Sequence, residues 1–135
     1  MLAHEDEPVV AVPERYDVGT VLVGYQDGVT VLTLLGEHDS STAGSLSALI
    51  REHADLGRGV VIVLSATEFI DSQIVRVLFQ GDMEMLHNGR RLVIQNDAEA
   101  TVERVLQLSG VRAQLLCSDT LDEAILLAAQ RYVED

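Results

Sequence analysis

The spacing of apolar residues changes from strand-like to helical within the first half of the chain. Residues 21–23 and 29–35 are rich in β-branched and aliphatic side chains, and the polar residues 26–28 between them suit a turn, which predicts a β-hairpin. Residues 41–56 place apolar side chains at helical spacing, and Gly57 follows, so an amphipathic helix is predicted to end there. The apolar positions of this helix are Ala43, Leu46, Leu49, Ile50 and Ala54.

The middle of the chain predicts a buried strand followed by a helix with two different faces. Residues 60–64 form a continuous apolar run after Gly59, as in a strand at the centre of a sheet that is buried on both faces. A helix is predicted from Asp71 and Ser72 to about His87. Its apolar stripe consists of Ile74, Val77, Leu78, Gly81 and Met85. Its polar stripe, which can face water or a partner, consists of Gln73, Arg76, Gln80, Glu84 and His87.

The last third of the chain continues the alternation of strands and helices. The remaining elements are a strand at residues 92–94, a helix at 98–108 ended by Gly110, a short strand around 115–116 and a last helix with the capping box Thr120-Leu121-Asp122-Glu123. No segment recurs at a fixed period. The order of elements predicts one α/β domain over residues 16–135, a mixed sheet of about five strands with about four helices packed on it.

Charge and composition narrow the choice of partners and compartment. The chain has 135 residues and a formal net charge of −13, and all nine of its basic residues are arginine. Such a surface repels a phosphate backbone and anionic lipid, so we expect no nucleic acid and no membrane among its partners, while a protein with a basic patch suits it. Residues 1–15 are rich in acid and proline without periodicity, which predicts a flexible acidic N-terminal arm.

The cysteine count and the absence of targeting features favour the cytoplasm. Cys117 is the single cysteine, so it cannot form an intramolecular disulfide, and we expect it to be a small hydrophobic residue of the core. The acidic start of the chain does not resemble a secretory signal. No apolar run approaches the roughly 20 residues of a membrane-spanning helix.

The sequence contains none of the common signatures of catalysis or of cofactor binding. A phosphate-binding loop of the Walker type needs a lysine that this chain lacks, and no glycine-rich dinucleotide-binding turn follows a predicted strand. The four histidines do not have the spacing of metal ligands, and no nucleophile elbow is present. We therefore expect no catalytic residues, no metal and no cofactor, and a protein that is not an enzyme.

One polar pair interrupts apolar sequence at a predicted helix start. Asp71 and Ser72 follow Phe69-Ile70, and both residue types are favoured N-caps, each worth about 1 kcal/mol, so capping is one interpretation. The other is a phosphorylation switch, because the free N–H groups and the positive dipole end of a helix N-terminus stabilise an added phosphate.

Several segments together resemble the STAS domains, the anti-sigma factor antagonists. The first two are Gly36-Glu37-His38-Asp39, followed by Thr42-Ala43, and Phe69-Ile70-Asp71-Ser72. Asn96-Asp97 and residues 102–111 resemble the third helix of the family and its closing turn, and the order of elements agrees from about Val18 to Ala129. Three short motifs occur in the right order on the right elements.

The resemblance implies a bacterial regulator that works by partner switching. Such an antagonist binds an anti-sigma factor that is also a serine kinase and thereby releases a sigma factor for transcription, and phosphorylation reverses the binding. Carried over to this chain, Ser72 is the phosphoacceptor, with Asp71 and Asp39 as acidic neighbours. The partner-binding surface is then expected at Asp39, Asp71, Gln73, Arg76, Gln80 and Glu84 on a monomer or weak homodimer.

Two departures from the family pattern keep alternatives open. Many antagonists read D-S-S/T-G-L, whereas Gln73-Ile74-Val75 follow Ser72 here and would place a larger side chain at the interface; His38 also replaces a more common apolar residue. The D-S-x-I form looks more like STAS subunits of stressosomes, large assemblies that regulate a switch kinase, in which Ser72 would be mainly a cap. The third alternative is an unrecognised enzyme or ligand-binding module.

Overall fold

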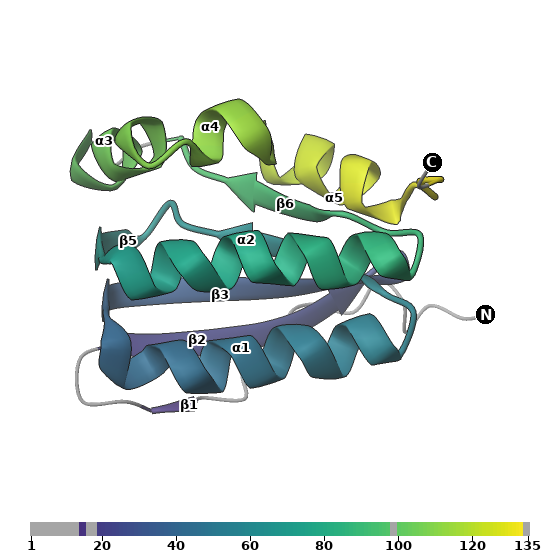
Figure 1. The fold of residues 1–135 in the computed structure, drawn as a ribbon, viewed down its shortest axis with the longest axis horizontal. Helices are drawn as coiled ribbons and strands as arrows, with labels where there is room; N and C mark the ends of the chain where they lie inside the picture. The colour runs from purple at the N-terminus through teal and green to yellow at the C-terminus, as the bar shows by residue number, and fades with distance from the viewer. Residues whose placement is uncertain (1–13, 16–18, 98–99, 134–135) are drawn as a thin grey trace.

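A computed structural model describes residues 14–15, 19–97 and 100–133, and these residues form one sheet with helices on both faces (Figure 1). The strands are β1 (Glu14–Arg15), β2 (Gly19–Gln26), β3 (Val29–His38), β4 (Gly59–Val63), β5 (Thr67–Ile70), β6 (Leu92–Gln95) and β7 (Leu116–Ser118). The helices are α1 (Ser40–Asp55), α2 (Ser72–His87), α3 (Ala100–Leu108), α4 (Val111–Gln114) and α5 (Leu121–Ala129).

The sheet is mixed, with an antiparallel start and a parallel remainder. Its order is β1-β2-β3-β4-β6-β7, with β5 paired to the far end of β3. β2 and β3 form the predicted hairpin, and its turn has positive φ at both Asp27 and Gly28, the geometry that an Asp-Gly pair favours because it matches the twist of the strands. From β3 onward the main-order strands pair in parallel, each joined to the next through a helix.

The two faces of the sheet carry two separate apolar cores. α1, α2, α3 and α4 pack on one face, where Leu46, Leu78 and Leu106 are fully buried against the sheet. α5 packs on the other face through Ala124, Ile125 and Ala128 against valines of β3, β4 and β6. The predicted central strand is therefore buried on both faces, because alternate side chains of β4 enter the two cores.

The predicted fold class is confirmed, and the prediction missed three short elements, β1, β5 and α4. α2 has the predicted bounds, α1 begins and ends one residue earlier than predicted, and the predicted strand at 115–116 lies at Leu116–Ser118. β5 and α4 have only four residues each, too few for a periodic pattern, so the prediction left them as loops. The count is therefore seven strands and five helices in the described residues, against about five and four predicted.

The predicted N-terminal arm is described only at its end. Glu14 and Arg15 form β1, which pairs antiparallel with β2, so these two residues are strand where no periodicity had been found. Residues 1–13 of the arm, and Ala98 and Glu99 of the predicted third helix, lie outside the described residues. Within the described ranges, none of the helices has the length and apolar character needed to cross a membrane.

Candidate functional site

The two acidic residues of the predicted site follow neighbouring parallel strands. His38 at the end of β3 pairs with Ile70 at the end of β5, so the next residues, Asp39 and Asp71, leave the same edge of the sheet side by side. Each is the N-cap of the helix that follows it, α1 or α2. The two helices start at the same side of the molecule and run alongside each other (Figure 1).

Asp71, rather than Ser72, caps helix α2. Its Oδ1 accepts hydrogen bonds from the backbone N–H groups of Gln73 at 3.0 Å and Ile74 at 3.1 Å. Ser72 is the first residue of the helix and is exposed. The capping role is therefore taken by the aspartate, and the serine hydroxyl lies at the surface beside two aspartate-capped helix starts.

Asp39 makes the corresponding cap on α1 with the help of a hydroxyl. One oxygen accepts from the backbone N–H of Ser41 at 2.8 Å and from its hydroxyl at 2.7 Å. These bonds, the hydroxyl's above all, lower the pKa of Asp39 because they stabilise the ionised carboxylate. The edge that carries Ser72 is thus negatively charged at neutral pH.

His38 lies buried beneath this edge. Its polar contacts explain how a histidine can occupy a position where the family more often has an apolar residue. Its Nε2 lies 3.2 Å from the carbonyl oxygen of Leu35 and its Nδ1 lies 3.1 Å from the hydroxyl of Thr42. Because a carbonyl can only accept, Nε2 carries the proton, and in the neutral ring Nδ1 is the acceptor that faces the Thr42 hydroxyl, whose single hydrogen is shared with the backbone carbonyl of Asp39 at 3.2 Å. Burial lowers the pKa of His38, and the ring fills the space left by the missing side chain of Gly19.

The polar stripe of α2 is exposed as predicted over most of its length. Gln73, Arg76 and Gln80 are exposed, whereas Glu84 is partly buried and forms an ion pair with Arg51 of α1, 3.4 Å between Nε and Oε2. Ile74 is fully buried in the core, so the larger side chain expected at the interface after Ser72 is Gln73 alone. Met83, which the prediction passed over, is 64% exposed on this helix.

A groove adjoins Ser72 that the sequence analysis did not predict. Its volume is about 430 Å³, and it is lined by Phe69, Ile70, Asp71, Ser72, Val75, Val105, Leu108 and Ser109. The groove brings together the end of β5, the first turn of α2 and the end of α3. Sequence alone gave no sign of it because β5 and α3 are distant in the chain and because β5 itself was not predicted.

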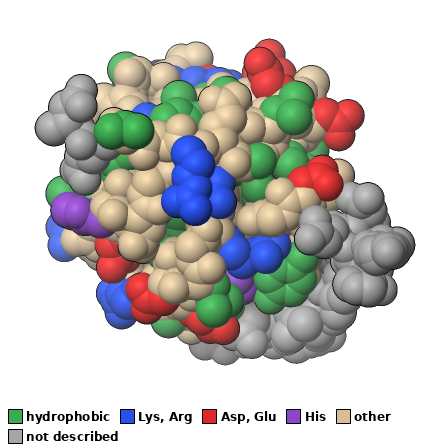
Figure 2. All heavy atoms as spheres, turned by 90° about the vertical axis from the view of Figure 1, so that its right-hand side faces the viewer, with side chains coloured by type: hydrophobic (Ala, Val, Ile, Leu, Met, Phe, Trp, Pro, Cys, Tyr) green, Lys and Arg blue, Asp and Glu red, His purple; other side chains and the backbone are tan. Residues whose placement is uncertain are grey.

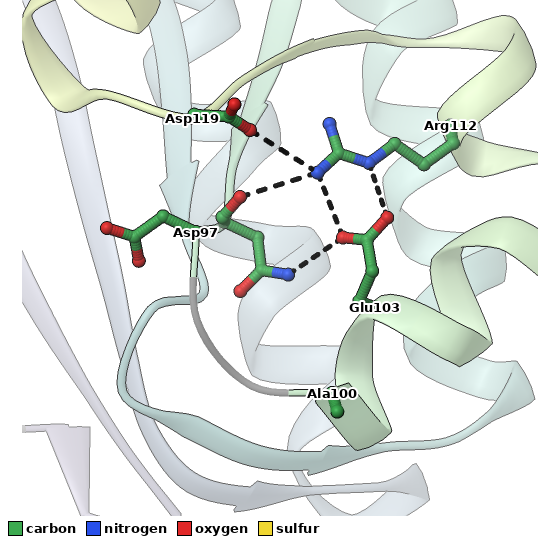
Figure 3. A pocket seen from close by; sticks show the side chains of 6 residues that line it. Asp97, Ala100, Glu103, Arg112 and Asp119 are labelled. Carbon is green, nitrogen blue, oxygen red and sulfur yellow. Dashed lines mark hydrogen bonds and ion pairs between the residues drawn. The ribbon is translucent and has the colours of Figure 1, made fainter.

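A second hollow, of about 310 Å³, lies where α3 and the ends of β6 and β7 meet (Figure 3). Arg112 binds Glu103 through two hydrogen bonds of 2.7 and 2.9 Å and approaches Asp119 at 3.7 Å, while Asn96 donates to Glu103 at 3.0 Å. The bond from Arg112 is the main reason that the pKa of Glu103 is lowered. These groups bind one another, so the network fixes α3 against the sheet.

The described residues contain no cluster of acidic, histidine or cysteine side chains that could hold a metal ion. Cys117 is partly buried in contact with the larger core, and burial raises the pKa of its thiol. Its placement agrees with the small hydrophobic residue that was predicted.

Comparison with known proteins gives the family. The sequence pattern of the STAS domain matches residues 21–124, and the chain belongs to that family. The structure is similar to that of an anti-sigma factor antagonist from Mycobacterium paratuberculosis, with 25% identity and a TM-score of 0.73 over 90% of this chain and 100% of that one. No curated protein matches the sequence significantly.

Two further solved structures share the fold at lower identity. One is the anti-sigma factor antagonist SpoIIAA in its unphosphorylated form, with 23% identity and a TM-score of 0.67 over 78% of this chain and 92% of that one. The other is the Bacillus cell-fate determinant SpoIIAA in its phosphorylated form, with 21% identity and a TM-score of 0.61 over 78% of this chain and 96% of that one.

Proposed function

We propose that this protein is an anti-sigma factor antagonist that binds an anti-sigma factor with serine kinase activity, releases a sigma factor, and is switched off by phosphorylation of Ser72. The observation that carries the proposal is the exposed Ser72 at the first position of α2, whose capping bonds are made by Asp71 instead. The protein itself acts by binding, without catalysis, in the cytoplasm, as a monomer or weak homodimer.

The chemistry of the site is compatible with a reversible phosphate. A phosphoserine carries a charge of about −1.5 to −2, and the positive dipole end of a helix N-terminus stabilises such a charge even though Asp71 already accepts from the N–H groups of Gln73 and Ile74. The fold can therefore accept the modification. A partner that had packed against a neutral hydroxyl would meet a dianion next to Asp71 and Asp39, so charge repulsion and desolvation would oppose its binding.

The partner surface proposed for the kinase is the edge at Asp39 and Asp71 together with the exposed stripe of α2. Gln73, Arg76 and Gln80 extend it along the helix, and Glu84 ends it beside Arg51. Because Asp39 and Asp71 already bind their own helix starts, they present rigid carboxylates with little conformational entropy left to lose.

The alternative is a non-enzymatic scaffold or a stressosome-type STAS subunit that regulates a switch kinase within a large assembly. Exposed Gln73, directly after Ser72, is the observation that favours it, since this side chain would alter the choice of partner. The two functions differ in size in solution. A monomer or dimer supports the antagonist, and a complex of many copies supports the stressosome subunit.

The first experiment is to isolate the protein from its own cells and to measure its intact mass before and after phosphatase treatment. Fragmentation then locates any phosphoryl group. Phosphate on Ser72 supports the switch. Persistent absence of phosphate across growth and stress conditions would overturn it.

The second experiment compares two variants for binding to purified candidate anti-sigma factor kinases of the same genome. We expect Ser72→Glu to weaken binding and Ser72→Ala to retain it. Binding of equal strength by the two variants contradicts a charge-driven release.

A further inference from the structure

The end of the sheet opposite Ser72 gathers positive charge in a chain whose net charge is −13. Figure 2 shows this end, with arginine side chains near its centre. Arg58 precedes β4, Arg90 precedes β6 and Arg131 follows α5, so the three residues lie at the edge where these parallel strands begin. These three residues are called the arginine face below.

The charges of the arginine face are not neutralised within the described part of the chain. Arg58 donates to the hydroxyl of Thr30 at 2.8 Å, and Arg90 donates to the carbonyl of Ala129 at 2.6 Å, so their partners are uncharged oxygens. Arg131 is exposed and has neither a hydrogen bond nor an ion pair with another described residue. The arginine face therefore keeps its positive charge.

Two of these guanidinium groups are neighbours of like charge. Burial lowers the pKa of Arg90, and the positive charge of Arg131 lowers it further. A Cβ placed on Gly89 would lie 3.6 Å from Nη1 of Arg131, which locates this group beside the residue that precedes Arg90. Neighbouring cations that lack a carboxylate are stabilised by any anionic group that approaches them. The occupant that this face favours is therefore negatively charged.

The chain directs an acidic segment of its own to this end. In β1, Glu14 pairs with Val21 and Arg15 with Thr20, so β1 runs from the side of the turn between β2 and β3 toward the end that carries the switch serine. The chain therefore enters β1 from the side of the arginine face. The sequence before β1 contains three consecutive acidic residues at positions 5–7, called the acidic segment below.

The acidic segment is close enough in sequence to reach the whole face. Glu5 lies nine residues before Glu14, a distance of up to roughly 30 Å in extended chain. From Val21 to the turn, β2 is only about 17 Å long. Next to that turn, the guanidinium carbon of Arg58 lies 4.8 Å from the ring centroid of Tyr25. Two strand spacings of about 4.8 Å each then lead from β3 to β6.

We propose that the acidic segment at residues 5–7 docks on the arginine face of its own chain. Because the contact is intramolecular, the tether supplies an effective concentration in the millimolar range, and weak attraction between exposed charges is enough to populate it. The docked segment neutralises cations that the rest of the fold leaves unpaired. The contact lies at the opposite end of the sheet from Ser72 and does not depend on the proposed switch.

The test places a nitroxide spin label before the acidic segment of the full-length protein and records by NMR which amide signals it weakens. The label is attached to Leu2→Cys, with the native thiol removed by Cys117→Ala, and the amide spectrum shows that this protein is folded. The tether alone brings the label toward the arginine face, so the deciding observations are the effects of salt and of charge. Arg131→Gln removes one cation of the face, and Arg104→Gln is the matched control, because Arg104 is exposed on α3.

We expect the label to weaken the amide signals of residues 57–59 and 89–91 at low ionic strength and to leave those of residues 70–72 unchanged. In about 1 M salt, where the screening length falls to about 3 Å, this loss of signal should shrink by about half. Arg131→Gln should reduce the loss as well, and Arg104→Gln should not. A loss of signal that neither salt nor Arg131→Gln reduces would overturn the proposal.

A second measurement keeps the native Cys117 and needs no label. The variant Glu5→Gln/Asp6→Asn/Glu7→Gln removes the charges of the acidic segment, and we expect the amide signals of residues 57–59 and 89–91 to shift relative to the wild type. Signals at these positions that coincide in the two proteins would contradict docking, whether or not the labelled protein folds.

A second copy of the chain is the competing occupant of the arginine face. A mixture of isotope-enriched protein without the label and unenriched protein with the label separates the two cases. If the enriched protein keeps its full signal, the contact is made within one chain, as proposed. If the signals of residues 57–59 and 89–91 weaken in the mixture, the acidic segment binds a neighbouring molecule and the proposal is wrong.

Discussion

The two ends of the sheet use their charged side chains in opposite ways. At the end where α1 and α2 begin, Asp39 and Asp71 bind the helix starts, and Ser72 with its groove stays accessible. The opposite end of the molecule is the surface that faces the viewer in Figure 2, and arginine side chains lie near its centre with acidic side chains around them. Arg58 there donates to the carbonyl of Val29 at 2.9 Å. Arg90 donates to the carbonyl of Ala129 at 2.6 Å.

This comparison indicates that the charged side chains of one end stabilise the fold, whereas those of the other end are available to a partner. The arginines of the second end hold backbone carbonyls and join segments distant in sequence, so their charges serve the fold. The first end carries carboxylates that need only local bonds, an exposed hydroxyl and uncovered apolar residues. If this division is correct, substitutions at the second end reduce stability, whereas substitutions at the first end alter stability little and partner binding strongly.

The largest effect is expected from Asp82→Ala, which removes the partner of Arg91 at the second end of the sheet, directly before β6. Asp82 is 7% exposed and binds Arg91 through two bonds of 2.9 and 3.0 Å, while its Oδ1 also accepts from the backbone N–H of Leu92. Its removal leaves a partly buried guanidinium and a buried N–H without hydrogen-bond partners, so we expect a loss of about 3 kcal/mol in the free energy of unfolding. Urea denaturation measures it.

The control for this variant is Glu84→Ala on the same helix. Glu84 also pairs with an arginine, Arg51, but the side chains of Glu84 and Arg51 keep 41% and 59% of their surface in contact with water. We expect a change below about 0.5 kcal/mol. Equal losses in the two variants would show that burial does not distinguish these ion pairs.

A smaller effect is expected from Asp71→Ala at the first end. The substitution removes the acceptor of two backbone N–H groups at the start of α2, and the loss of such a cap costs about 1 kcal/mol. Water can replace part of the cap because the site lies at the surface. A loss as large as that of Asp82→Ala would contradict the division between the two ends.

The sequence predicted the parts of the fold that depend on local patterns. The hairpin follows from its Asp-Gly turn, α1 and α2 from their apolar spacing, and the last helix from Thr120, whose hydroxyl does accept from the N–H of Glu123. The family resemblance, rather than a local pattern, implied that Asp39 and Asp71 lie close together, and the parallel register of β3 and β5 places them side by side.

What the sequence could not predict depends on contacts between distant segments. β5 is a strand because three of its four residues pair with the end of β3, where the register shifts after Gly36, and no pattern within β5 signals that pairing. The groove needs Phe69 and Leu108 to meet across 39 residues of chain. Comparison with the family motif placed Ile74 at the interface, but this position lies on the inner side of α2 and the Ile74 side chain is buried in the core.

A pH effect is expected from His38 at the first end. Burial lowers its pKa below the ordinary value of 6.5, so on acidification the unfolded chain takes up a proton before the folded one. Stability should therefore be constant above about pH 6.5 and fall as the pH decreases through the folded pKa. Asp39 and Glu103, whose pKa values are lowered below those of ordinary carboxyls, stay ionised in this range.

The variant that isolates this effect is His38→Gln. A glutamine amide can donate to the carbonyl of Leu35 and accept from Thr42, as the neutral ring does, but it does not titrate. We expect the variant to lose the decrease in stability below about pH 6.5, measured by urea denaturation at each pH. If the free energy of unfolding of the variant decreases with falling pH as steeply as that of the wild type, a group other than His38 causes the decrease.

The smallest effect on stability is expected from Ser72→Ala, and this variant distinguishes a cap from a switch. Ser72 is exposed, and Asp71 already satisfies the N–H groups of Gln73 and Ile74, so the change should stay within about 0.5 kcal/mol. Ser41→Ala is the matched control on α1, because the Ser41 hydroxyl binds Asp39 at 2.7 Å and its loss should cost more. If Ser72→Ala instead destabilised the protein by about 1 kcal/mol, the hydroxyl would have a capping role after all, and the case for an unoccupied, modifiable serine would weaken.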